Sequence, residues 1–570
     1  MTTIGGVLLT TEAQQAHISG HLPLLCVFFT LCIVSLLWSK PRLTRLVAEL
    51  RCEWITLCKL FCKSLTASPE TRIELWAILA LSALGVFLRI SHLGRPVRYD
   101  EAFTYTEFAS HPLRIALSHY GFPNNHLLNT LLIHLSTSIF GNNTVALRLP
   151  ALIAGCLTIP ASWLAGRALY GPLAGILSAG CIAALPTFIE YSINARGYTL
   201  QWLSVLALMW LGTGLYEDAA LKSGWLAFLF SGVVGLYSVP TTIIPILGIS
   251  IWILLSAFVR GGLSQFNSVL KRLLWAGLAI GLISTFLYLP VLVVSGPDAL
   301  LSNRFVVSGT SQSFLRNLAS LIRDTWMRWT EGVPEVAVWI LIAGLILGTA
   351  FHRKVSLHAL PMTLVLWVSS FLFAWARNVV GYPRVWSYLL LAAIMTAAAG
   401  LSVLILLLAG HSRVRQVFLV SAASTLLSAF IGAGVVQRQI LFLNSETGAA
   451  VDTDQIANFL LSVLRPGDRL VATSPVYIIL DYELQRRNPK LYEALSTSRD
   501  ARRVIAVVSK QYAASESVRT DERYALLAAE GAADPASILA QIDVSAYNSP
   551  RLLAKFLTVT VYSFEVKQRS

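Results

Sequence analysis

Charged residues are scarce in this chain of 570 residues. They make up 13% of the sequence, whereas hydrophobic residues make up 55% and the mean hydropathy is +0.65. Soluble globular chains carry roughly 25% charged residues. A soluble enzyme is therefore excluded, and the composition predicts a mainly α-helical, polytopic membrane protein.

Cysteine is absent from the last two thirds of the chain. All seven cysteines precede residue 182, so no disulfide framework can form in the C-terminal part. Cys52, Cys58 and Cys62 lack the paired spacing of a zinc site. The sequence also lacks a Gly-rich nucleotide fingerprint, a phosphate loop and a nucleophile elbow. We expect no cofactor, and a divalent metal ion is not indicated.

Acidic residues are too few to balance the basic ones in the N-terminal three quarters of the chain. Up to residue 436 there are 28 Lys and Arg against 15 Asp and Glu, and after it 16 against 15. The excess positive charge therefore lies between apolar segments, where it reflects membrane topology and lipid phosphate. No nucleic-acid partner is expected.

The apolar segments suggest about 12 membrane spans. They lie at 22–38, 75–93, 147–166, 172–190, 198–215, 225–239, 241–259, 272–294, 336–351, 357–376, 385–409 and 416–436. The run 126–140 has about 15 residues where roughly 20 are needed to span, and we interpret it as an interfacial helix. Every lysine before residue 437 then faces the cytoplasm, and the cations left on the outer face are all arginines.

Three regions follow from this topology. Residues 1–74 are expected to hold an extra helix and a basic cytoplasmic segment, 75–436 the main membrane module, and 437–570 an extracytoplasmic α/β domain. The module has outer loops at 94–146 and 295–335. In the last region, strands are predicted at 469–473, 503–508 and 557–566, with helices at 475–487 and 521–530.

The stretch from Arg98 to Leu127 holds two adjacent acids, Asp100 and Glu101, where a membrane helix should meet water. Ionisable groups at such a depth are costly and are commonly functional. One of the acids could act as the base that takes a proton from an acceptor hydroxyl. The alternative is that both acids cap the following helix, since acidic side chains sit well at a helix N-terminus.

Four motifs in order and at similar spacing carry a family resemblance. They are RYDEAFTY, FPNNHLLNTLLIHL, TVALRLPALIAGCLTIPASWLAGRALYG and EYSINARGYTLQWLSVLAL, followed much later by GYPRVWSYLLLAAI. Together they resemble the N-terminal module of the GT-C glycosyltransferases. This superfamily uses polyprenyl-phosphate sugars and includes protein O-mannosyltransferases, the lipid A aminoarabinose transferase and the oligosaccharyltransferase catalytic subunit.

The resemblance implies roles for five residues. Asp100 is expected to be the base, with Glu101 sharing that role or supporting the loop, and Arg148, Arg384 and Arg196 are expected near the lipid phosphate. Where O-mannosyltransferases have His-Pro-Pro, this chain has Asn124, Asn125 and His126. These three residues are weak candidates for acceptor or sugar contacts. Trp326 and Trp329 of the second outer loop are two more. No metal ligands are predicted.

We therefore predict a membrane glycosyltransferase that moves a sugar from a polyprenyl-phosphate donor to an acceptor hydroxyl, with inversion, on the outer face. Membrane lipids are further partners, and the expected location is the bacterial inner membrane with the active site and C-terminal domain on the periplasmic or extracellular face. The alternatives are a transporter or lipid flippase, which should carry charges at mid-membrane depth, and a structural or sensory membrane protein. The sequence names neither the sugar nor whether the acceptor is a glycan, a lipid or a protein.

Overall fold

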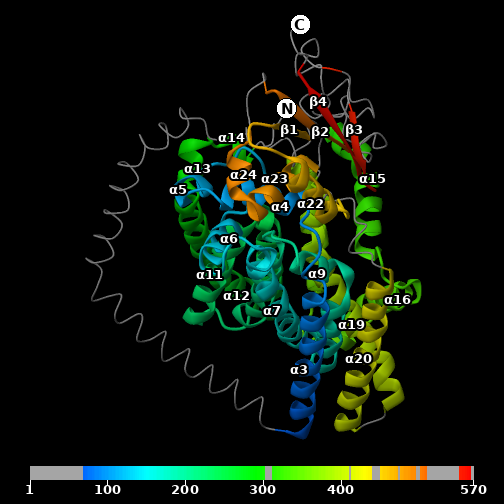
Figure 1. Ribbon diagram of the computed structural model, residues 1–570. Helices are drawn as coiled ribbons and strands as arrows, with labels where there is room; N and C mark the ends of the chain where they lie inside the picture. Colours follow the sequence, from blue (N-terminus) through cyan, green and yellow to red (C-terminus); the bar gives the residue numbers. More distant parts are fainter. Residues whose placement is uncertain are drawn as a thin grey trace.

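The computed structural model describes residues 68–301, 311–379, 381–409, 412–438, 450–472, 476–495, 501–509, 548 and 551–566. The predicted apolar helix at 22–38, the basic segment that follows it up to residue 67 and the predicted helix at 521–530 lie outside these residues. Within the described part, the fold is mainly α, as predicted (Figure 1).

The main bundle consists of apolar helices that coincide with the predicted segments from residue 75 onward. They are α3 (Pro69–Ile90), α7 (Thr144–Tyr170), α8 (Pro172–Ala184), α9 (Pro186–Ser192), α10 (Tyr198–Leu215), α11 (Lys222–Ser238), α12 (Ile243–Leu287), α16 (Glu335–Ala350), α18 (Met362–Arg377), α19 (Ser387–Ala409) and α20 (Arg413–Arg438). By length and composition, five helices of the described part can cross a membrane, or seven if two bent pairs each count as one span. The number of about 12 spans stays a prediction.

Helix α12 joins two of the predicted segments into one element. Its backbone leaves helical geometry at Gly261 and Gly262, and Gly262 has φ of +62°. Only glycine adopts such a conformation at low cost. The two glycines therefore mark the turn that the sequence predicted as a loop between 259 and 272.

Helices α16 and α19 pack backbone against backbone. A Cβ atom on Gly400 would lie 1.9 Å from the carbonyl oxygen of Gly344, and one on Gly348 would lie 2.1 Å from that of Thr396. Such close approach needs small residues, as in other membrane helix pairs. It fixes α19 and with it the short helix η3 (Pro383–Trp386), which precedes α19 directly.

A bend of 61° separates α8 from α9. Pro186 cannot donate a hydrogen bond, and the fully buried Arg89 of α3 donates instead to the carbonyl oxygens of Ile182 and Ala183 and to Ser192 Oγ, at 2.9–3.1 Å. Because the freed carbonyl groups are satisfied, the bend is stable. It directs α9 and the following segment towards the first outer loop.

The loops between the long helices contain shorter elements. The first outer loop holds α4 (Tyr99–Thr104), the π-helix η1 (Tyr105–Ala109), α5 (Leu113–Ala116) and α6 (Leu127–Phe140). The other connections hold η2 (Pro240–Thr242), α13 (Leu289–Val294), α14 (Asp298–Leu301), α15 (Ser311–Thr330) and α17 (His352–Val355).

Helix α6 is the predicted interfacial helix, and its polar side chains face the protein. Asn129 donates to the carbonyl oxygen of Ala195 (3.0 Å), and Thr130 donates to Asn125 Oδ1 (2.8 Å). Apart from Ser138, the exposed side chains are apolar, with Ile139 71% and Phe140 61% accessible. The amphipathic pattern therefore turns its polar face to the loop and its apolar face outward.

The C-terminal part forms a small α/β unit. It contains α22 (Thr453–Val463), β1 (Arg469–Ala472), α23 (Val476–Arg487), α24 (Pro489–Glu493), β2 (Arg503–Ser509), β3 (Arg551–Lys555) and β4 (Val559–Glu565). The sheet order is β1-β2-β4-β3, with β1 parallel to β2 and the other pairs antiparallel. Figure 1 shows the sheet at one end of the bundle, with α23 and α24 between it and α4. One hydrophobic core joins this unit to the first outer loop.

Candidate active site

The two acids of the first outer loop lie in the first turn of α4 but in different surroundings. Glu101 is completely buried. Its carboxylate accepts hydrogen bonds from Arg148 Nε and Nη2 (both 2.7 Å), from the Ala195 backbone N–H (3.0 Å) and from the Arg98 backbone N–H (3.1 Å). Glu101 therefore caps its own helix, as the alternative interpretation expected, and fastens that helix to α7.

All the N–H donors of the Arg148 guanidinium group are engaged in hydrogen bonds. Besides Glu101, its guanidinium group donates to the backbone carbonyl oxygens of Leu93 (2.6 Å), Arg95 (2.8 Å) and Pro96 (3.1 Å). A guanidinium group has five N–H donors, and these five bonds use all of them. The structure therefore places Arg148 at the turn between α3 and α4, and the predicted phosphate contact of Arg148 has no support from this geometry.

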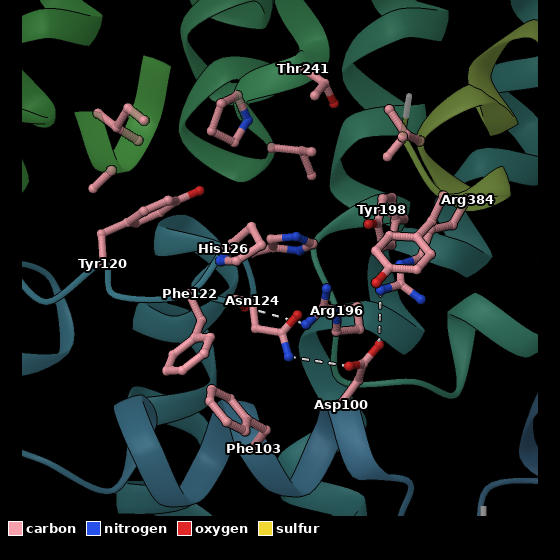
Figure 2. Close-up of a pocket in the computed structure, with 18 of the residues that line it drawn as sticks. Asp100, Phe103, Tyr120, Phe122, Asn124, His126, Arg196, Tyr198, Thr241 and Arg384 are labelled. Atoms are coloured by element: carbon pink, nitrogen blue, oxygen red, sulfur yellow. Dashed lines mark hydrogen bonds and ion pairs between the residues drawn. The ribbon is translucent and has the colours of Figure 1, made fainter. Parts of the chain in front are cut away.

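Asp100 faces a cavity of about 170 Å³ that is built by the two outer loops, the start of α10 and η3. We call it the polar cavity. Asp100 Oδ1 accepts a hydrogen bond from Asn124 Nδ2 (3.2 Å), and Arg384 Nη2 lies 3.5 Å from Asp100 Oδ2 (Figure 2). Oδ2 accepts no hydrogen bond from any described residue. One carboxylate oxygen is thus available towards the cavity.

Two arginines line the polar cavity beside Asp100. Arg196 follows α9, and its Nη1 donates to the carbonyl oxygen of Asn124 (3.3 Å), while its Nε is buried with no hydrogen-bond partner among the described residues. Arg384 belongs to η3 and lies with its guanidinium carbon 4.4 Å from the ring centre of Tyr382. Figure 2 shows Asp100, Arg196 and Arg384 pointing to the same space. Such a pair of guanidinium groups suits a phosphate group.

His126 lies in the same cavity in a defined tautomer. Its Nδ1 accepts a hydrogen bond from the Gly197 backbone N–H (2.8 Å), so in the neutral ring Nε2 carries the proton. Burial, and then the nearby Arg196 and Arg384, hold the pKa of the imidazole well below its usual range. A Cβ atom on Gly197 would lie 2.9 Å from His126 Nδ1, so this contact requires glycine.

Aromatic side chains form the wall of the polar cavity next to α4. The rings of Tyr99 and Phe103 are 5.8 Å apart, and those of Phe103 and Phe122 are 5.3 Å apart at 78°. Tyr120 lines the cavity beside them. Flat aromatic faces of this kind suit the C–H face of a sugar ring.

Three of the weaker candidates lie elsewhere. Asn125 is fully buried and ties the loop together by donating to the carbonyl oxygens of Ala116 and His119 (both 2.8 Å). Trp326 and Trp329 of α15 line a second cavity of about 80 Å³, bounded by α15, α16, α18 and α19. Its lining is almost wholly apolar, and we call it the apolar cavity.

An ion-pair network that the sequence did not suggest braces the loops. Glu190 of α9 pairs with both Arg98, the N-cap of α4, and Arg328 of α15, and Arg328 also pairs with Glu331. Its only sequence signal was a lone acid in an apolar stretch, just before NARGY. Tyr99, Tyr120 and Tyr382 were also not predicted as cavity residues. Among the described residues, no group of three or more His, Cys, Asp or Glu side chains could hold a metal ion.

An apolar helical bundle thus carries an acid and two arginines in one loop cavity, as expected of a polytopic membrane protein. Residues 126–293 match the family model described as dolichyl-phosphate-mannose-protein mannosyltransferase. The resemblance expected from the sequence motifs is thereby confirmed.

Solved structures agree with this fold. The chain is similar to ArnT from Cupriavidus metallidurans in the apo state, with 14% identity, a TM-score of 0.51, and coverage of 85% of this chain and 97% of that one. The same protein bound to undecaprenyl phosphate matches with 13% identity, the same TM-score and the same coverage. No curated protein matches the sequence.

Proposed function

We propose that the protein is a membrane glycosyltransferase that moves a sugar from a polyprenyl phosphate to an acceptor hydroxyl. The observation that carries the proposal is the polar cavity, where Asp100 lies beside Arg384 and Arg196. ArnT, which has this fold, binds undecaprenyl phosphate. The transporter alternative is not favoured, since Asp100, Arg196 and Arg384 gather in one cavity lined by loops (Figure 2).

In the proposed reaction, Asp100 takes the proton from the acceptor hydroxyl. The acceptor oxygen forms a bond to the anomeric carbon while the bond from that carbon to the phosphate oxygen breaks. The polyprenyl phosphate leaves with the electron pair, and Arg384 and Arg196 stabilise its charge. Attack opposite the leaving group inverts the anomeric centre.

The neutral His126 assists by donating its Nε2–H to the sugar or phosphate. Asn124 orients the carboxylate through its bond to Oδ1. A carboxylate that accepts a hydrogen bond at one oxygen, and at the other has only an ion pair at 3.5 Å, is suited to general-base work. The donor phosphate is therefore expected beside Arg384 and Arg196, with its sugar next to Asp100.

The apolar cavity offers a place for the start of the polyprenyl chain. It follows α19 through Leu390, Ile394 and Ala397, and α19 begins directly after η3, which carries Arg384. A lipid whose phosphate contacts Arg384 could therefore lay its first isoprene units along α19. In this arrangement Trp326 and Trp329 contact the lipid chain instead of a sugar.

We further propose that the polar cavity faces the outer side of a bacterial inner membrane. The basis is the positive-inside distribution of lysines, which places the loops with Lys222, Lys271 and Lys354 in the cytoplasm. The C-terminal unit packs on the same end as the polar cavity and would share its side.

Substitution of Asp100 by Asn tests the proposal. The purified protein is placed in proteoliposomes with a panel of labelled undecaprenyl-phosphate sugars and with membrane extract as the acceptor source, and released undecaprenyl phosphate is measured. We expect Asp100→Asn to lower turnover by about 10²–10⁴-fold, because the amide cannot accept the proton. Asp324→Asn is the matched control, since Asp324 is exposed on α15 and should leave turnover unchanged. Turnover of Asp100→Asn at the unmutated rate would refute the role of Asp100.

A further inference from the structure

The C-terminal unit contacts the wall of the polar cavity directly through α23. The hydroxyl groups of Tyr477 and Tyr99 are 3.3 Å apart, and their rings meet edge to face at 6.1 Å and 71°. Tyr99 lines the polar cavity, whereas Tyr477 belongs to the C-terminal unit. A residue 378 positions away in the sequence is therefore one side chain away from the cavity.

Three consecutive residues of α4 contact three different parts of the molecule. Glu101 is held by Arg148 on the side of the bundle, Asp100 faces the cavity, and Tyr99 reaches both the cavity and α23. In a helix, neighbouring side chains point about 100° apart. A six-residue helix cannot hold its own direction, because short helices are marginal without packing. Helix α4 thus depends on both supports.

The support from the C-terminal unit is extensive. Tyr482 of α23 packs its ring edge to face against Tyr105, at 5.4 Å and 86°. Phe103, Tyr105 and Phe108 share one buried core with Ile478, Ile479 and Tyr482. The Tyr99–Tyr477 pair packs against this core and borders the cavity through Tyr99.

We propose that Tyr477 is a positioning residue for the acceptor side of the active site. It holds the Tyr99 ring in the aromatic wall, one residue from Asp100. The C-terminal unit thereby shapes the path by which the acceptor hydroxyl reaches Asp100. This inference rests on the proposed glycosyltransferase function.

A double-mutant cycle between Tyr99 and Tyr477 tests the inference. Tyr477→Phe keeps the ring and removes the hydroxyl group, and so does Tyr99→Phe. We expect each to lower turnover of undecaprenyl-phosphate sugar about 3- to 10-fold, which is the range that one neutral hydrogen bond supports. The double variant should be no slower than either single variant, because both remove the same bond. Affinity for undecaprenyl phosphate should stay within about twofold, since a phosphate bound by arginines does not depend on this pair.

Tyr482→Phe is the matched control on the same helix. The Tyr482 hydroxyl group is buried and has no hydrogen-bond partner among the described residues, and the ring contact with Tyr105 is kept. Turnover by this variant should equal that of the unmutated protein. If Tyr477→Phe also works at the full rate, or if it weakens turnover and undecaprenyl phosphate affinity equally, the positioning role is refuted.

Hydrogen exchange provides a readout that needs no turnover. In Tyr477→Phe, the amide groups of α4 should exchange faster than in Tyr482→Phe, while those of α7 and α10 stay unchanged. Unchanged exchange in α4 would overturn the inference even if the protein is a glycosyltransferase. Conversely, faster exchange in α4 together with absent turnover by the unmutated protein would overturn the proposed function and leave the mechanical link between α23 and α4 intact.

Discussion

Two consecutive acids of α4, Asp100 and Glu101, each pair with an arginine from another element, and the two pairs differ in how fully their hydrogen bonds are satisfied. In the pair of Glu101 and Arg148, every donor of the arginine is used and the acid accepts four hydrogen bonds. In the pair of Asp100 and Arg384, the closest approach is 3.5 Å and the acid keeps one oxygen without a hydrogen bond. The pair of Glu101 and Arg148 has no hydrogen-bonding capacity left for a ligand, whereas the pair of Asp100 and Arg384 can still bind one. The same residue types thus provide a structural clamp and a candidate reaction centre.

Breaking the closed pair should have the largest effect. Glu101→Gln leaves Arg148 buried without its counter-charge, and removing one partner of a buried pair costs about 3–5 kcal/mol. We expect a clear fall in the thermal unfolding midpoint in detergent and a poorly folded first outer loop.

The control for this prediction is Glu217→Gln. Glu217 pairs with Arg260 at 3.0 Å, but both side chains are about half exposed. Exposed pairs contribute roughly 0–1 kcal/mol, so this variant should unfold close to the unmutated protein. If both variants unfold alike, the contrast between the closed pair and ordinary surface pairs is wrong.

Opening the second pair should affect turnover and leave folding intact. Arg384→Ala removes one of the two cations proposed to hold the leaving phosphate, and loss of one such group costs about 10²–10³-fold in turnover. We expect weaker binding of undecaprenyl phosphate as well, measured by native mass spectrometry. Arg377→Ala, a change of another arginine near the same end of the bundle, should have a small effect on both. An Arg384→Ala variant that binds the lipid normally would contradict the assignment.

The smallest expected effect concerns a third acid, Glu107 of η1, which faces Asp481 of α23. Burial, with a further contribution from Asp481, raises the pKa of Glu107 to about 8. Its pKa in the unfolded chain is near 4.5, so the folded state holds the proton more tightly. The contribution of protonated Glu107 to the free energy of unfolding is complete below about pH 4.5 and is lost as the pH rises through about 8.

Stability should accordingly fall by about 2 kcal/mol between pH 6 and 8 through this group. Glu107→Gln, which cannot ionise, should remove that part of the pH dependence in unfolding measurements across this range. The dependence should persist in Glu70→Gln, since Glu70 lies at the far end of α3. A Glu107→Gln variant with the same pH profile as the unmutated protein would contradict a buried, protonated Glu107.

The sequence predicted the helices well because their signal is local. Long apolar segments, the short run that became α6 and the apolar strands β1, β2 and β4 all carry their pattern in consecutive residues. Strand β3 was missed because it is short and mostly exposed at the sheet edge. Helix α22 was missed although Asp452, a residue type favoured at the N-cap, directly precedes it. The break inside α12 was predicted as a loop, but the continuation of one helix into the next was not.

The roles within the site could be predicted only in part. Asp100 and Glu101 are equivalent in the sequence, and what separates them is whether Arg148 or the cavity lies opposite. Arg148 was expected at the phosphate from the resemblance, yet its donors are taken up by the turn between α3 and α4. Tyr477 had no local signal at all, because its contact with Tyr99 exists only once the C-terminal unit has packed on the first outer loop.

The most direct test is a structure of this protein with undecaprenyl phosphate bound. We expect the phosphate group within hydrogen-bond distance of Arg384 and Arg196 in the polar cavity, near Asp100, with the pair of Glu101 and Arg148 still closed. A phosphate bound to Arg148, with Glu101 released from it, would contradict the account.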